Sequence, residues 1–417
     1  MSMTPLDIPP LRQLRAFAAA ARLESVSGAA RAVNLSQPGL TQSLHALEAR
    51  LAARLFDRRH SGCYVTPLGA ILLPRVRRFF DHLDAALRAP MIGGPFAASV
   101  NKITAAQMRS LIAIAQSPSM EAAARRLDVA QPSLHRPARE LERELRRSLL
   151  HRTAQGVTTN PQGAELARRF QVALREIAYG LEELAAAQGA VVARIAVGNI
   201  PHSGERILSA AIDALLETFP HAHVRVVDGP YEALLDDLRA GRLDLLFGVL
   251  RRPQWATDVT EERLFDNPYV VVARADHPLR GAARITPRAL ARYGWIMPEA
   301  GAPRRQAFAR LFAGQTAPPV SIETTSLAIY RSVLAASDRL TLMSRLAARS
   351  DESAALAVLP FGSPHLHRAD GIACRVDWQP THVHMRFLAL LRAEARRMAA
   401  DGEAARSASG HRREVPG

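Results

Sequence analysis

Apolar residues recur at helical spacing from the start of the chain. Leu14 and Phe17 mark a first helix, and Ala29 and Ala30 mark a short second one. Ser36 is a suitable N-cap for a third helix, because its side chain can accept a hydrogen bond from a free backbone N–H group. Leucines then follow at spacings of four and three, at Leu40, Leu44, Leu47 and Leu51. The pattern predicts three helices around one core, as in a helix-turn-helix domain.

The same pattern returns 94 residues further on. Residues 13–70 align with residues 107–164 without a gap, and about 20 of the 58 positions are identical. Both copies keep a Gln-Pro pair at the start of the third helix, at Gln37 and Gln131. Only two copies exist, so the sequence predicts a duplicated domain rather than a longer helical array. We call residues 8–90 the first repeat and residues 102–189 the second repeat.

A long amphipathic helix is expected at the end of each repeat, at 68–87 and 162–188. Pro74 interrupts the first near its start. An apolar stripe outside a compact core needs a partner, and we expect each helix to pair with its own copy in a second subunit. The stripe at 166–184 is the cleaner of the two, so it is the expected principal dimer contact. The alternative is that each helix packs back on its own domain.

From about residue 191 the pattern alternates between strands and helices, which favours a parallel sheet with crossover helices. A second unit of the same kind follows, and a segment at 385–391 is expected to return the chain to the first unit. The expected strands are 194–199, 224–227, 243–249, 264–265, 269–273, 295–297, 320–323 and 340–343. The expected helices are 205–218, 231–240, 306–312 and 327–336.

Polar side chains occupy the face of the third helix opposite its leucines. In the first repeat these are Gln37, Thr41, Gln42 and His45. Side chains of this size and polarity can hydrogen-bond base edges in the major groove of DNA. A basic turn follows, in which Arg58 and Arg59 can reach phosphates. The alternative is a helical packing module whose polar face is only solvated.

The second repeat departs from the first within the same helix. Ala130 replaces the capping serine, a loss of about 1 kcal/mol for the helix start. Pro137 removes one backbone hydrogen bond and biases Arg136 away from helical geometry. The DNA-facing set becomes Gln131, His135, Arg136 and Arg139. Both DNA contact and a purely structural role remain open for this repeat.

Composition agrees with a polyanionic partner. The formal net charge is +15 and the pI is near 11.1, and residues 1–190 hold 25 basic and 15 acidic side chains. Lys102 is the single lysine, however, so part of this basicity reflects an arginine-rich coding bias. Cys63 and Cys374 are too few for a disulfide framework. Without a secretion signal or a long apolar run, we expect a soluble, cytoplasmic protein that does not enter a membrane.

Three segments of the first repeat resemble the N-terminal domain of LysR-type transcriptional regulators: Ser36-Gln37-Pro38, the run 47–58 and the Thr-Pro-Leu-Gly motif at 66–69. Residues 238–245 and 272–279 are similar to the effector domain of the same family. The resemblance implies two winged helix-turn-helix domains with linker helices. After them it implies an α/β effector domain at 191–398, with two lobes like a periplasmic binding protein. Residues 401–417 are expected to be a disordered tail.

The resemblance also implies the residues of two sites. At the DNA we expect Ser36, Gln37, Pro38, Gly39, Thr41, Gln42, Arg58, Arg59, Gln131, His135 and Arg136. Ligands of open α/β sheets bind beyond the carboxyl ends of strands. The expected effector contacts are therefore Asn199, Pro201, His202, Ser203, Gly248, Val249, Thr325 and Ser326. Helix N-termini favour an anionic or polyhydroxy effector, although Ser203 and Ser326 can equally be plain N-caps.

An enzyme is the less favoured class. Two His-x-His pairs are present, His365 with His367 and His382 with His384; on a strand each pair would share one face, an arrangement that can ligate a metal. Such pairs are more often only solvated, and we expect no metal, cofactor or catalysis. The predicted function is effector-controlled, sequence-specific binding to double-stranded DNA by a homodimer or homotetramer, with RNA polymerase as a further expected partner. The alternative is a ligand sensor with degenerate heads that acts through protein contacts.

Overall fold

The computed structural model describes residues 8–59, 62–89, 102–154, 156–190, 193–201, 204–251, 256–349 and 355–411. The chain divides into two compact units, Met1–Val192 and Ala193–Gly417. Within the described ranges, no helix is long and apolar enough to cross a membrane.

The first repeat folds as the periodicity predicts, with three helices, a two-stranded wing and a long helix. Ser36 caps the third helix, because its Oγ accepts a hydrogen bond from Gly39 N at 3.2 Å. Leu40, Leu44 and Leu47 point into the core and are fully buried. The elements are α1 Leu11–Leu23, α2 Val26–Ala32, α3 Gln37–Leu51, β1 Phe56–Arg59, β2 Gly62–Val65 and α4 Pro67–Arg88.

The second repeat has the same order of elements. Ala130 provides no side-chain cap, as expected. The helix nevertheless runs unbroken through Pro137 and includes Arg136, so the expected bias at Arg136 is overridden; buried Leu134 and Leu141 hold it against its own core. α4 likewise continues through Pro74. The elements are α5 Ala105–Ala115, α6 Met120–Leu127, α7 Gln131–Leu145, β3 Leu150–Thr153, β4 Gly156–Thr159 and α8 Pro161–Ala187.

A carboxylate, half-buried in the first repeat and buried in the second, joins the third helix to the wing. Glu48 Oε1 accepts hydrogen bonds from the backbone N–H groups of Leu55 and Phe56 at 2.8 and 3.0 Å. Glu142 Oε1 does the same for Leu149 and Leu150 at 2.7 and 3.0 Å. These donors begin the wing strand and would otherwise lack partners. The 94-residue offset therefore holds for the hydrogen bonds as well as for the residues.

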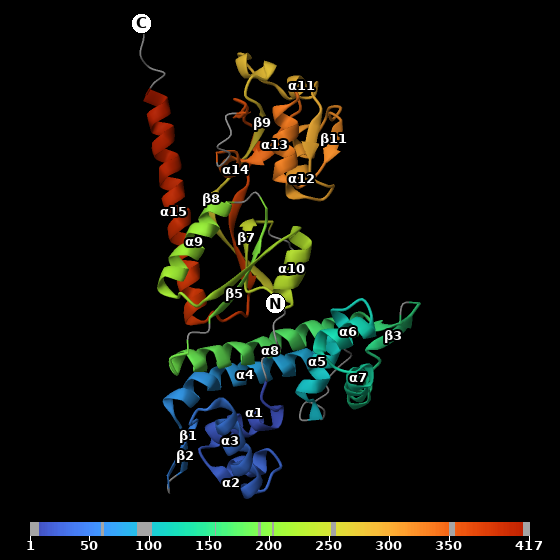
Figure 1. The fold of residues 1–417 in the computed structure, drawn as a ribbon, viewed down its shortest axis with the longest axis vertical. Helices are drawn as coiled ribbons and strands as arrows, with labels where there is room; N and C mark the ends of the chain where they lie inside the picture. The colour runs from blue at the N-terminus through green and yellow to red at the C-terminus, as the bar shows by residue number, and fades with distance from the viewer. Residues whose placement is uncertain are drawn as a thin grey trace. The chain divides into compact units, whose positions relative to one another are not determined.

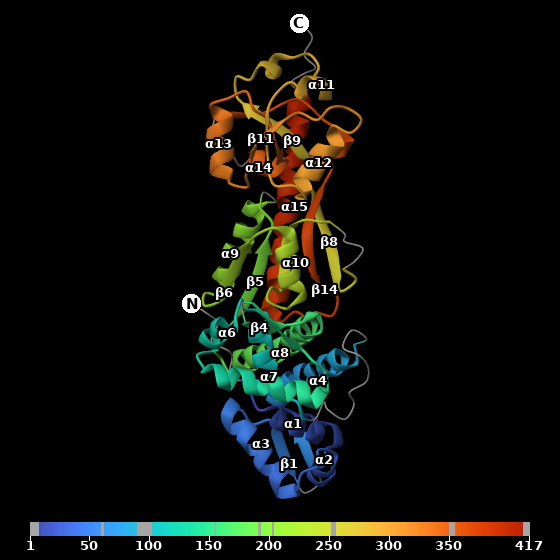
Figure 2. The ribbon, with the colours of Figure 1, turned by 90° about the vertical axis from the view of Figure 1, so that its right-hand side faces the viewer.

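The two long helices pack against each other inside one chain. α4 and α8 run side by side (Figure 1, Figure 2). Leu72 and Phe79 of α4 share one continuous core with Phe170 and Ile177 of α8. The expectation that the α8 stripe is the principal contact with a second subunit is therefore wrong, because α4 of the same chain covers it. Neither helix packs only on its own domain.

The second unit begins with a five-stranded sheet in the order β6-β5-β7-β14-β8. α10 lies on one side of this sheet, and α9 and α15 lie on the other (Figure 1). Its strands are β5 Arg194–Asn199, β6 His223–Asp228, β7 Leu245–Val249, β8 Val259–Asp266 and β14 Ala369–Arg375. Its helices are α9 Glu205–Thr218, α10 Tyr231–Arg239 and α15 His382–His411. Parallel pairing of β5 with β6 and β7 confirms the predicted crossovers.

The chain then builds a second group of short sheets with its own core, around Trp295 and Phe308. β12 and β13 flank β9, while β10 pairs with β11. The strands are β9 Tyr269–Arg274, β10 Trp295–Met297, β11 Val320–Glu323, β12 Thr341–Ser344 and β13 Leu356–Val358. The helices are η3 Pro278–Gly281, α11 Pro287–Leu290, α12 Pro303–Leu311, α13 Leu327–Ala335, α14 Arg345–Arg349 and η4 Pro364–Leu366.

The return to the first sheet differs from the prediction. The returning strand is β14, which the pattern did not indicate, and residues 385–391 lie on that sheet as part of α15. Short apolar runs fit a buried helix as well as a strand, which explains the error. α15 continues to His411, so the disordered tail expected from Asp401 is wrong as far as that residue. Residues 412–417 lie outside the described residues.

Candidate functional site

The polar face of α3 is uncovered within its unit. Gln37 and Gln42 are exposed and Thr41 is half-buried, while the leucines on the opposite face are buried. Of the other expected DNA contacts on this helix, Ser36 and Pro38 are exposed and Gly39 is half-buried. A capped helix with an exposed, amide-rich face can donate hydrogen bonds to base edges and accept hydrogen bonds from them.

The wing arginines differ in how firmly they are held. Arg58 lies between the wing and α3, with its Nη2 3.4 Å from Glu48 Oε2 and its Nη1 in contact with the His45 ring. Arg59 is 68% exposed and pairs with Asp57 at 2.9 Å. An exposed pair of this kind is weak, so a phosphate can compete for Arg59. Arg58 is better placed to orient the wing.

The corresponding face of α7 is neutralised by its own helix. Arg136 pairs with Glu140 at 2.9 Å, and Arg139 pairs with Glu142 at 2.7 Å. Arg139 Nε also donates to His135 Nε2 at 3.2 Å. Gln131 remains exposed. The second repeat therefore offers a less cationic face than its sequence indicates.

A cationic cleft of about 1020 Å³ lies between α1, α4 and the start of α5, and sequence reasoning missed it. Its seven cationic and two acidic side chains are Arg12, Arg15, Arg22, Arg50, Arg77, Lys102, Arg109, Asp81 and Asp84. This excess of positive charge attracts phosphate. The charge count of the first 190 residues was the only signal, because the lining residues come from both repeats.

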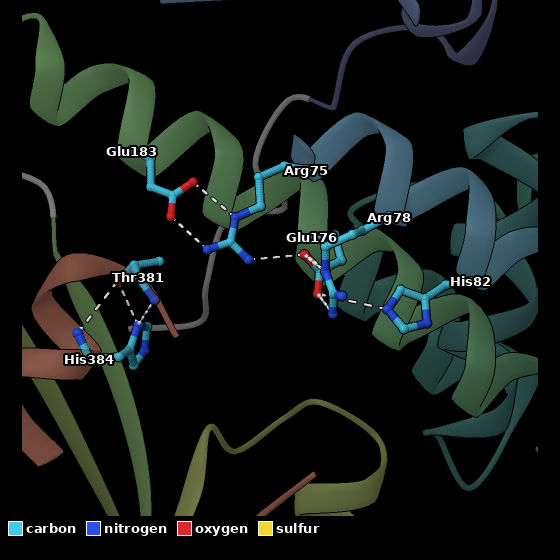
Figure 3. A network of polar contacts seen from close by, with 7 residues as sticks. All are labelled: Arg75, Arg78, His82, Glu176, Glu183, Thr381 and His384. Carbon is cyan, nitrogen blue, oxygen red and sulfur yellow. Dashed lines mark hydrogen bonds and ion pairs between the residues drawn. The ribbon is translucent and has the colours of Figure 1, made fainter. Parts of the chain in front are cut away.

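A buried ionic network joins α4 to α8 (Figure 3). Arg75 Nη1 donates to Glu176 at 3.0 Å, and its Nε and Nη2 donate to Glu183 at 2.9 and 2.6 Å. Arg78 Nε donates to Glu176 at 3.1 Å, and His82 Nε2 lies 3.8 Å from the same carboxylate. Later positions on α4 thus meet earlier positions on α8, so the helices are antiparallel.

The network holds the Glu176 carboxylate in its charged form. Burial alone would raise the pKa of Glu176, but hydrogen bonds from His82 and Arg78 and the charges of Arg78 and Arg75 outweigh it. The pKa falls to about 2. Glu176 is therefore ionised at any physiological pH.

The expected effector contacts fall into two groups in the second unit. Asn199 ends β5 beside β7, where Ile200 N donates to Phe247 O at 3.0 Å. Its side chain is 4% exposed; Nδ2 donates to Asp228 at 2.7 Å, while Oδ1 has no partner within the described part of the chain. A buried hydrogen-bond acceptor without a partner lowers the stability of the fold, so a ligand that donates a hydrogen bond to Asn199 Oδ1 would be stabilised here.

The other expected contacts differ in their exposure to solvent. Gly248 and Val249 are buried, and the Val249 side chain packs into the core below α10. Pro201 is half-buried, whereas His202 and Ser203 lie outside the described residues. Thr325 and Ser326 are exposed, and Ser326 is an N-cap whose Oγ accepts from Ile329 N at 3.4 Å. These residues line neither the cationic cleft nor the small hollow beside Arg139 and Arg146.

Two crossing segments tie the five-stranded sheet to the smaller sheets. Asn267 follows β8, and its Nδ2 donates to Asp370 of β14 at 2.7 Å. Arg368 Nε donates to the other oxygen of Asp370 at 2.9 Å. Asn267 Oδ1 accepts from Leu346 N at 3.0 Å, which adds α14 to the junction. No sequence signal separated this Asn or Asp from ordinary polar residues.

The histidine pairs do not form a common site. His382 and His384 lie on α15 rather than on a strand, and His384 is buried with its Nε2 3.2 Å from Asp244. His365 lies in η4, whereas His367 is exposed near Asp266. Among the described residues, no group of three or more His, Cys, Asp or Glu side chains is arranged to hold a metal ion.

Two family descriptions match the chain. Residues 188–396 match the LysR substrate binding domain. Residues 11–70 and 105–164 each match the bacterial regulatory helix-turn-helix protein of the lysR family. The second description thus applies twice, to segments that coincide with the two repeats.

Several known proteins are similar over most of their own length. The HTH-type transcriptional regulator GalR of Pseudomonas putida is 32% identical over 378 residues, covering 89% of this chain and 94% of that protein. PcaQ of Agrobacterium fabrum, another HTH-type transcriptional regulator, is 31% identical, covering 66% of this chain and 89% of its own. Among solved structures, a point variant of full-length OxyR from Pseudomonas aeruginosa has a TM-score of 0.56 at 26% identity. That match covers 70% of this chain and 95% of that one.

Proposed function

Because this chain belongs to the LysR family of transcriptional regulators, we propose that its first repeat reads DNA sequence and that its second unit sets the response to a small molecule. It is a DNA-binding regulator with an effector-binding domain. The finer proposal is that Gln37, Thr41 and Gln42 contact base edges. Ser36, Pro38 and Gly39 would bring the helix start to the phosphates, with Arg59 on the backbone and Arg58 orienting the wing.

The open polar face of α3 carries this proposal. An exposed glutamine side chain can form two hydrogen bonds with the major-groove edge of an adenine. The buried leucines on the opposite face hold the helix against its core. The same openness disfavours the alternative of a ligand sensor with degenerate heads, at least for the first repeat. For the second repeat a weaker or structural role stays open, because Glu140 and Glu142 neutralise its arginines.

A matched pair of variants tests the assignment. Gln37→Ala should weaken binding to the operator by about 1 to 3 kcal/mol and relax preference at one base position. Gln131→Ala, at the corresponding position of the second repeat, is the control and should cost less. Affinities are measured by fluorescence anisotropy on operator and scrambled DNA. Unchanged operator affinity in Gln37→Ala would exclude α3 as the reading helix.

For the effector, we propose a site between the five-stranded sheet and the smaller sheets, which would be two lobes like those of a periplasmic binding protein. The Asn199 Oδ1 atom favours a ligand that carries a hydroxyl or N–H donor. That supports the polyhydroxy class over a purely anionic one. Pro201, His202, Ser203, Gly248, Val249 and Thr325 remain proposed contacts, Gly248 and Val249 through their backbone.

Calorimetry on the full chain with a panel of polyols, sugars and hydroxy acids tests this site. Asn199→Ala should abolish binding of the compound that wild type takes, whereas Ser326→Ala should change it little if Ser326 acts as an N-cap. Binding that survives Asn199→Ala would place the effector elsewhere. A DNA-bound regulator also implies a cytoplasmic location, association into a homodimer or homotetramer, and RNA polymerase as a partner, which we propose as well.

A further inference from the structure

We propose that the complementary faces of α4 and α8 make each single chain a complete DNA reader with two heads, the helix-turn-helix elements α1 to β2 and α5 to β4. Such a chain recognises two half-sites of unlike sequence. The inference rests on the proposed DNA-binding function. It adds that the two heads belong to one chain, and that Glu176 and Glu183 determine this pairing.

The pairing is chemically heterotypic. α4 supplies the cations Arg75 and Arg78, and α8 supplies the carboxylates Glu176 and Glu183. Arg75 and Glu176 are 6% and 3% exposed, so each buried charge needs the opposite charge beside it to offset the free-energy cost of its burial. A hydrogen bond from Gln188 at the end of α8 to Ala52 O, at 2.8 Å, ties the same helix to the first head.

The 94-residue offset shows why α4 does not suit a second copy of itself. In the first repeat, His82 stands where the second has Glu176, and Ala89 stands where it has Glu183. Two α4 helices paired in the observed geometry would therefore place Arg75 opposite a histidine and an alanine. The buried guanidinium groups would lose their carboxylates, which is strongly unfavourable.

Close packing at Gly180 also makes α8 a better partner for α4 than a second α4 helix would be. A Cβ atom on Gly180 would lie 2.9 Å from Arg75 Cβ and 3.0 Å from Leu72 Cδ1, so only glycine allows this approach. The corresponding residue of α4 is Ala86. An α4 helix in the place of α8 would therefore stand further off.

Covalent connection favours the same outcome. Partners joined by a short linker meet at an effective concentration on the order of 1 mM. At about 1 μM protein, exchange of α4 between chains is then disfavoured by roughly a thousandfold before the charges are counted. The two heads of one chain consequently stay together.

Unlike half-sites follow from unlike faces. α3 presents exposed amides, Gln37 and Gln42, whereas α7 presents Gln131 beside internally paired arginines. Two identical heads suit a palindrome. Two different heads fixed to each other suit a site whose halves differ.

Crosslinking in the full-length protein tests the pairing without DNA. Ala52 and Gln188, the sites of the two cysteine substitutions, are exposed, and they are in contact between the first head and the end of α8, outside the ionic network. With a short bismaleimide, the double variant should crosslink within the monomer, at a yield independent of concentration from 1 to 100 μM. A mixture of the two single variants should give no covalent dimer above the wild-type background. Dimers in that mixture, at a yield comparable to the internal crosslink, would overturn the proposal.

Charge reversal tests the determinant. Glu176→Arg in the crosslinking background should lower the internal yield at least tenfold, and adding Glu183→Arg, Arg75→Glu and Arg78→Glu, which reverses every charge of the network, should restore it. Glu165→Arg is the matched control, since the ion pairs of Glu165 among the described residues are with Arg168 and Arg169 of its own helix. Equal loss in the control, or no loss in Glu176→Arg, would refute the role of the network. The restoring variant also shows whether a loss came merely from misfolding.

Selection of binding sites from random DNA separates this inference from the proposed function. The expected site has two unlike halves about one helical turn apart, and Gln37→Ala alters only one of them. A palindromic site that Gln37→Ala alters in both halves would overturn the inference while leaving DNA binding intact. Failure to select any sequence would instead refute the proposed function, and the crosslinks alone would then decide the pairing.

Discussion

Replacing Glu176 by glutamine is the sharpest perturbation of the unit that holds both heads. The change keeps the size of the side chain and removes the charge that faces Arg75 and Arg78. Both α4 and α8 should lose stability, because the buried guanidinium group of Arg75 and the half-buried one of Arg78 would share a neutral amide. Local opening of these helices should become more frequent than opening of α3.

The size of the loss follows from the pKa. Glu176 has a pKa of about 2 in the folded chain against an ordinary value of 4.5. A difference of this size corresponds to about 3 kcal/mol of stability at neutral pH. The side chain is only 3% exposed, so solvent screening takes little from this figure.

The pH dependence gives the assay its control. A carboxyl group with a lowered pKa stabilises the fold above its unfolded pKa and loses that effect as pH falls. The wild type should therefore be more stable than Glu176→Gln by about 3 kcal/mol at pH 7, and the difference should vanish between about pH 4.5 and 2. Hydrogen exchange of α4 and α8 measures it at pH 7, and urea unfolding follows it to lower pH. A difference that is absent at pH 7, or that does not shrink in acid, would refute this reasoning.

Three further outcomes are expected. Gly163→Ala should destabilise the second repeat by more than 1 kcal/mol in thermal unfolding, because a Cβ there would lie 2.1 Å from Leu149 O; an unchanged melting temperature would contradict this contact. Arg59→Ala should weaken binding to all DNA sequences alike and lower the salt slope by about one, and loss on the operator alone would assign Arg59 to base reading. Asp244→Ala should destabilise the second unit by about 2 kcal/mol or more in urea unfolding, because Asp244 is fully buried and accepts a hydrogen bond from Ala196 N at 2.7 Å. An unchanged unfolding midpoint would show that this hydrogen bond contributes little.

Local patterns predicted most of the elements in each unit. The helices of the first repeat and the strands from β5 to β12 follow from apolar spacing and caps, which are properties of neighbouring residues. Pro137 shows where such reasoning fails, because the buried leucines of α7 outweigh a local preference. The segment 385–391 shows a second limit, since its apolar run suits either a helix or a strand.

Long-range pairing was harder to predict than local structure. An apolar stripe indicates that a helix needs a partner but does not identify that partner. The sequence therefore predicts a second subunit as the partner of α8, where the structure has α4 of the same chain. The charges that select α4 sit about a hundred positions away, at Arg75 and Arg78. The cationic cleft escaped prediction for the same reason. For the effector site, Asn199 stands out only once its buried Oδ1 is seen to lack a partner among the described residues.

The central claim is that one chain carries two joined heads for DNA. The most direct test is hydroxyl-radical footprinting with a fragment of residues 1–192, which contains its own core, while native mass spectrometry counts the fragments on each duplex. One fragment per duplex should protect two half-sites about one helical turn apart. A requirement for two fragments to protect the same pair of half-sites would contradict the account.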